Sequence, residues 1–159
     1  MIEKHLNMRH EKYSLESDSR YLLFEFVSVG PKGSINKVVQ CTETEVRHYY
    51  NLGFGDVDTI TGEISDSIIT NNGDSRKVLA TVASTLYVVT SRYPEAAIYA
   101  KGSTPVRTRL YRIAISNHLN EIGDDFDVYG KRQERWQVFR RNVDYSAFLV
   151  KRNNTFVRS

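Results

Sequence analysis

The residues best suited to chemistry lie in one stretch, KGSTPVRTRLYR at residues 101–112, which combines a glycine, several hydroxyls and several cations. Cations at the start of a helix are unfavourable, because the helix dipole places positive partial charge there. A bound phosphate reverses that preference, since backbone N–H groups and cationic side chains then act on it together. The stretch therefore predicts an anion-binding site. Its expected ligand-binding residues are Lys101, Gly102, Ser103, Thr104 and Arg107.

The position of Arg107 on the predicted helix sharpens this expectation. Thr104 is a suitable N-cap and Pro105 a suitable first helical residue. At about 100° per residue, Arg107 falls on the apolar side of the helix, where a guanidinium needs a partner. Three alternatives stay open for it: a bound anion, solvent, or a carboxylate such as Asp56, Asp58 or Asp74. Arg109 and Arg112 fall outside the apolar side or at its margin, so we expect them to be solvated.

The same helical stripe carries groups that could catalyse a reaction. Tyr111 and His118 share the side of Arg107, and a metal-independent ribonuclease can work with His, Arg and Tyr around a phosphate. The candidate catalytic residues are thus His118, Tyr111 and Arg107, although a core histidine with a satisfied hydrogen bond explains the pattern as well. The four histidines lack metal-ligand spacing, so we predict no metal site and no cofactor.

Charge is distributed unevenly along the chain. Residues 1–74 carry 7 Lys+Arg and 12 Asp+Glu, whereas residues 75–159 carry 15 and 7. Arginine dominates the basic half, and it suits bidentate phosphate or carboxylate contacts. A nucleic-acid surface is predicted at Arg132, Arg135, Arg140 and Arg141. Trp136 could stack on a base there, but alternation along a strand favours a place in the core.

Hydrophobic periodicity predicts a single α+β domain over residues 1–159, with a mainly antiparallel sheet and two long helices packed on it. Residues 1–12 are a candidate flexible segment. Expected strands are 21–29, 34–42, one or two within 51–70, 96–100, 125–130, 134–141 and 145–152. Expected helices are 75–93 and 105 to about 121. Turns are expected at 30–33, 130–131 and 142–144.

Cellular location can also be estimated. The N-terminus lacks the apolar core of a secretory signal, and no run of about 18 apolar residues is present. The single cysteine, Cys41, cannot form an internal disulfide. These features predict a cytoplasmic protein without a membrane partner.

Several motifs occur in an order that resembles a family of short bacterial proteins of unknown function, common in Bacteroidetes. The motifs are GPKG at 30–33, NLGFGD at 51–56, NNGD at 71–74, KVLATVA at 77–83 and GSTPVRTRLYR at 102–112. The resemblance implies a bacterial intracellular protein and carries over no catalytic residue. Families of this type are often suspected of serving in toxin–antitoxin or phage-defence loci.

Three functions follow from these observations. The first is recognition of a phosphorylated ligand, RNA or a nucleotide, through the basic half of the chain. The second is a toxin-like ribonuclease that uses His118, Arg107 and Tyr111 and has an antitoxin-like partner. The third is a protein-interaction module or homodimer in which acidic and basic halves pair.

Overall fold

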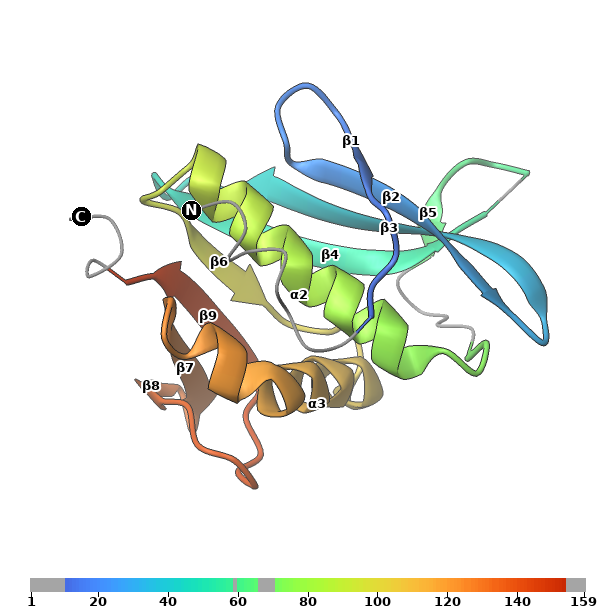
Figure 1. Ribbon diagram of the computed structural model, residues 1–159. Coiled ribbons are helices and arrows are strands. Elements are labelled where there is room, and N and C mark those ends of the chain that lie inside the picture. The colour runs from blue at the N-terminus through green and yellow to red at the C-terminus, as the bar shows by residue number, and fades with distance from the viewer. Residues whose placement is uncertain (1–10, 59, 66–70, 154–159) are drawn as a thin grey trace.

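One sheet of nine strands runs through the molecule, and both long helices lie on the same face of it (Figure 1). The computed structural model describes residues 11–58, 60–65 and 71–153. Of the candidate flexible segment 1–12, residues 1–10 lie outside the described residues. The helices are α2 (Ser75–Arg92) and α3 (Pro105–Ile122). The strands are β1 (Glu16–Ser17), β2 (Leu23–Gly30), β3 (Gly33–Glu43), β4 (Tyr49–Val57), β5 (Ile64–Ser65), β6 (Ala97–Ala100), β7 (Phe126–Arg132), β8 (Arg135–Val138) and β9 (Ala147–Arg152).

The sheet confirms the predicted α+β, mainly antiparallel class in a single domain. Its strand order is β1-β2-β3-β4-β6-β9-β7-β8, with β5 pairing to β4. The pairs that the structure describes are antiparallel except β4 with β6, which is parallel. The chain leaves β4, forms β5 and α2, and returns as β6, as a parallel pair requires. Residues 97–152 therefore build one side of the sheet and residues 16–65 the other.

Of two hairpin turns predicted at glycines, one is confirmed and the other is wrong. Gly33, at φ +91°, closes the β2–β3 hairpin as predicted. The predicted turn at Gly130 is wrong, because the β7–β8 turn lies at Gln133 and Glu134, both with positive φ. Gly130 is needed inside β7 for a different reason: a Cβ there would lie 2.4 Å from a ring carbon of Tyr145.

The core fills the space between the helices and the sheet. The helix α2 is buried along most of its length, since its apolar residues recur at helical spacing. Fully or nearly fully buried side chains from both layers are Phe24, Val39, Val89, Ile98, Ile122, Phe126 and Phe148. Cys41 is buried on β3, and that burial raises the pKa of its thiol to about 12. In the part of the chain that the structure describes, no helix has the length and apolar character to cross a membrane.

Candidate anion-binding cleft

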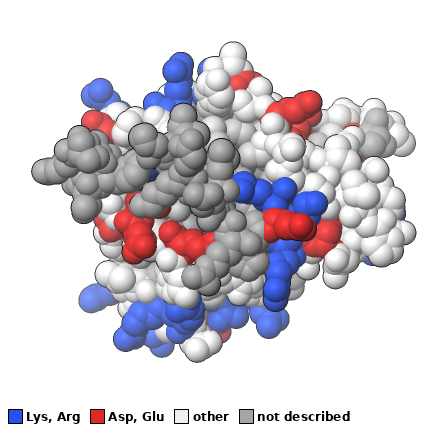
Figure 2. Space-filling view, viewed as in Figure 1, with Lys and Arg blue, Asp and Glu red and all other residues white. Residues whose placement is uncertain are grey.

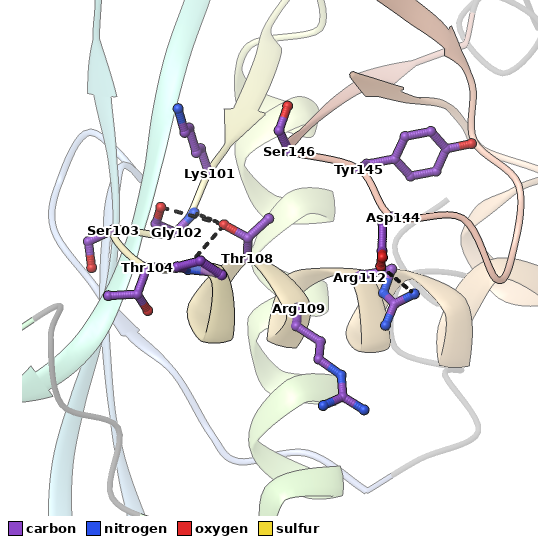
Figure 3. Close-up of a pocket in the computed structure, with 11 residues that line it drawn as sticks. Lys101, Gly102, Ser103, Thr104, Thr108, Arg109, Arg112, Asp144, Tyr145 and Ser146 are labelled. Atoms are coloured by element: carbon purple, nitrogen blue, oxygen red, sulfur yellow. Dashed lines mark hydrogen bonds and ion pairs between the residues drawn. The ribbon is translucent and has the colours of Figure 1, made fainter. Parts of the chain in front are cut away.

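A cleft of about 480 Å³ opens between the start of α3 and the segment that leads into β9 (Figure 3). This volume is within the range of small-molecule binding sites. One wall comes from the end of β6 and the first turns of α3, and the other from residues 144–146. The lining residues are Lys101, Gly102, Ser103, Thr104, Pro105, Thr108, Arg109, Arg112, Asp144, Tyr145 and Ser146.

Local interactions fix the strand-to-helix corner beside the cleft. Gly102 packs so closely on α3 that a Cβ would lie 2.4 Å from the backbone nitrogen of Thr108. The Gly102 N–H donates to Thr108 Oγ1 at 3.0 Å. Thr104 has the extended backbone of an N-cap, and its Oγ1 accepts a hydrogen bond from the Arg107 N–H at 3.2 Å. The predicted cap is confirmed, and it occupies one backbone donor, the Arg107 N–H, in the turn predicted to hold the anion.

The cleft gathers more positive than negative charge. Lys101 and Arg109 are exposed, and neither makes a hydrogen bond or ion pair with another residue that the structure describes. Arg112 forms an ion pair of 3.3 Å with Asp144, whose side chain is 99% exposed. Such an exposed pair contributes little and exchanges readily. The first turn of α3 contains no acidic residue, so the helix dipole adds to the positive potential.

Arg107 lies elsewhere, on the inner face of α3. It is 4% exposed, as its position on the helical wheel predicted. Its Nη2 donates to the main-chain carbonyl of Phe54 on β4, and its guanidinium carbon lies 5.9 Å from the centre of the Phe54 ring. Arg107 Nη1 is buried and has no hydrogen-bond partner among the described residues. The structure therefore separates Arg107 from the other four predicted ligand-binding residues.

The carboxylates considered as partners of Arg107 are occupied by other groups. Asp56 Oδ1 pairs with Lys37 Nζ at 2.5 Å, and this lysine is 1% exposed. Asp58 accepts hydrogen bonds from backbone N–H groups in its own turn. Asp74 precedes α2 without capping it through its side chain, and instead accepts hydrogen bonds from Tyr13 and Ser28 hydroxyls. Of the three alternatives for Arg107, the carboxylate is thus replaced by a main-chain carbonyl.

Of the three cations that line the cleft, sequence reasoning included Lys101 and missed Arg109 and Arg112. Arg109 and Arg112 lie about 60° apart on the wheel, so they share one outer side of α3. Two arginines on one outer side of a helix indicate a local concentration of positive charge. The same pattern is also typical of a solvated helix face, which is what we expected for them. The second wall, residues 144–146, comes from a distant part of the chain, and only the pairing of β9 beside β6 brings it there.

The three candidate catalytic residues are all buried side chains of α3. Arg107, Tyr111 and His118 are 4%, 7% and 1% exposed. His118 Nδ1 lies 3.5 Å from Glu121 on the next helical turn. Because a helix rises 1.5 Å per residue, Arg107 and His118 are separated by about 16 Å along the axis. This spacing provides no single point at which one phosphate could meet all three.

The four arginines predicted to bind nucleic acid form two pairs at opposite ends of β8. Arg132 and Arg135 face each other across the β7–β8 hairpin. Arg140 and Arg141 follow the other end of β8, and Arg141 donates to the Ser116 carbonyl on α3. Figure 2 shows basic side chains gathered along the lower margin, where Figure 1 places α3 and β8.

Comparison with known proteins identifies the family of the chain. The residues 9–153 match the model of a family of unknown function, DUF6934, and the chain belongs to that family. No curated protein and no solved structure matches it. In the described residues, no group of three His, Cys, Asp or Glu side chains could hold a metal ion.

Proposed function

We propose that this member of the DUF6934 family binds a phosphorylated ligand, RNA or a nucleotide, in the cleft at the start of α3. One observation carries the proposal: Lys101 and Arg109 line the same cleft and are unpaired among the described residues. Charged side chains that serve stability alone are normally paired or dispersed on the surface. Two cations that line one cleft instead suit a ligand that carries several negative oxygens.

Arg112 gives the cleft a third cation that a ligand can recruit. Its present partner, Asp144, is fully exposed and held at 3.3 Å. A phosphate can replace this carboxylate, because it offers Arg112 two oxygens in the geometry of the guanidinium fork. Asp144 would then turn to solvent at little cost. The proposal places this binding in a bacterial cytoplasm, as the resemblance to short bacterial proteins implies.

Calorimetric titration with pyrophosphate and with ATP tests the proposal. The double variant Lys101→Ala/Arg109→Ala is expected to bind both ligands at least tenfold more weakly, since two charge-assisted contacts are lost. Arg76→Ala is the matched control, because Arg76 is an exposed arginine in the first turn of the other long helix. Equal affinities for the double variant and the unaltered protein would refute a site in this cleft.

A further inference from the structure

On the face of the sheet opposite the helices, the strands β6 to β9 carry aromatic, apolar and basic side chains in adjoining rows. Ile98 and Val150 point to the helices and line the interior with α2 and α3 residues. Since side chains alternate along a strand, their neighbours Tyr99 and Leu149 point to the other face. The register places Tyr99, Leu149, Tyr129 and Val138 in one row across β6, β9, β7 and β8. The adjoining row contains Ala147, Lys131 and Trp136.

Two aromatic side chains meet over this face. Tyr99 on β6 and Trp136 on β8 are three strand spacings apart, about 14 Å between backbones. Their ring centres nevertheless lie 6.0 Å apart, at an interplanar angle of 80°. Ala147 lies on β9, between the two strands and in the row of Trp136, and its small side chain leaves room for this contact. We call Tyr99 and Trp136 the aromatic platform.

Trp136 is accessible from solvent, contrary to the expected place in the core. It is 41% exposed, although a tryptophan offers more apolar area for burial than other side chains. Lys131 Nζ lies 5.8 Å from the centre of its ring. Lys131 also approaches Glu134 at 3.5 Å, but Glu134 is 89% exposed and holds the lysine weakly. A cation therefore stands beside an open aromatic ring.

The aromatic platform and the cleft are connected through the backbone of the sheet. Ser146 lines the cleft, and its backbone N–H donates to the Lys131 carbonyl at 2.8 Å. Lys101, on the other wall, follows Ala100 at the end of the strand that carries Tyr99. A chain of alternating bases and phosphates could thus lie with a phosphate in the cleft and a base on the platform.

We propose that the ligand is a single-stranded nucleic acid, with an unpaired base stacked on Trp136 and the neighbouring phosphate held by Lys101 and Arg109. This inference rests on the proposed function and adds the chemical class of the ligand. An exposed indole beside cations complements a base and its phosphate, which is how single strands are bound without sequence preference. A duplex does not fit the arrangement, since its bases are paired and stacked inside.

The single tryptophan of the chain makes the inference directly measurable, because intrinsic fluorescence reports on Trp136 alone. A short oligoadenylate is expected to quench this fluorescence on binding. An abasic ribose-phosphate oligomer of equal length is expected to leave it unchanged. Binding of oligoadenylate without quenching would overturn the inference.

Variants test the same contact through the affinity for labelled oligoadenylate, measured by fluorescence anisotropy. Trp136→Leu is expected to weaken binding about tenfold, as loss of one stacked base should, and Trp136→Phe to retain most of the affinity. Tyr21→Leu is the matched control, since Tyr21 is 43% exposed and also lies beside a cation, Arg92, but belongs to the acidic half. Unchanged affinity for Trp136→Leu would refute the stacking role.

The two proposals fail in distinguishable ways. Pyrophosphate binding in the cleft with no effect of oligoadenylate on Trp136 would refute only the single-stranded ligand. Quenching that is insensitive to Lys101→Ala/Arg109→Ala would refute the cleft and keep the aromatic platform. Absence of binding by pyrophosphate, ATP and oligoadenylate would refute both.

Discussion

The two sides of α3 carry charge in opposite ways. On the inner side, Arg107 bonds to the Phe54 carbonyl, and the neighbouring sheet holds the buried pair of Lys37 and Asp56. On the outer side, Lys101 and Arg109 are exposed, and the described residues leave them unpaired. The inner and outer cations lie close to the same turns of α3. They differ in whether protein groups or water compensate their charge.

This contrast separates charges that hold the fold from charges available to a ligand. Removing a buried ion from water is expensive, so an inner cation must be compensated by protein groups. An exposed cation is compensated by water, and it can exchange that water for a phosphate at small cost. Burial and protein partners, rather than charge alone, therefore distinguish the proposed ligand contacts Lys101 and Arg109 from Arg107.

The largest effect is expected from breaking the inner pair. Lys37→Met leaves Asp56 without its buried cation and should lower the free energy of unfolding by about 3–5 kcal/mol. Urea unfolding measures this change. Lys101→Met, an exposed lysine replaced in the same way, should change the free energy by less than about 0.5 kcal/mol. If both variants lost the same free energy of unfolding, the buried and the exposed lysine would not differ in their contribution to stability.

A more conservative change compares two arginines on one helix. Arg107→Lys keeps the charge but loses the planar fork, so the hydrogen bond to Phe54 is impaired and stability should fall by about 1–3 kcal/mol. Arg109→Lys should leave stability within about 0.5 kcal/mol while weakening pyrophosphate binding. Urea unfolding and calorimetric titration of both variants give the comparison. If Arg107→Lys instead binds ligand poorly with unaltered stability, Arg107 belongs to the site after all.

The smallest effect concerns the cap between the two sides. Thr104→Ala removes the acceptor of the Arg107 N–H at 3.2 Å and should cost about 1 kcal/mol. Thermal unfolding detects a change of this size. Thr104→Ser keeps the hydroxyl and should restore most of the loss. A full loss in the serine variant would show that the methyl group, and not the cap, stabilises this corner.

Hydrophobic periodicity predicted most of the helices and strands, because each apolar stripe must be buried and few packing arrangements bury all of them. The span of α3 follows from Thr104, Pro105 and Gly123, which are local signals. The β7–β8 turn was misplaced because Gly130 serves a tertiary contact with Tyr145, and such a need is invisible in the local sequence. Only one wall of the cleft was predicted, for the same reason. The residues of that wall are neighbours in sequence, whereas the pairing of β9 with β6 places the segment 144–146 opposite them.

The one parallel pair among the described strands, β4 with β6, has a consequence for where the proposed ligand contacts are encoded. It joins two stretches of chain, and the whole of the cleft and the aromatic platform lies in the second, between Tyr99 and Ser146. A short continuous piece of gene therefore encodes every residue proposed to touch a ligand. Substitutions within that piece would change the proposed ligand contacts and leave the sequence of the first stretch, which supplies β1 to β5, as it is.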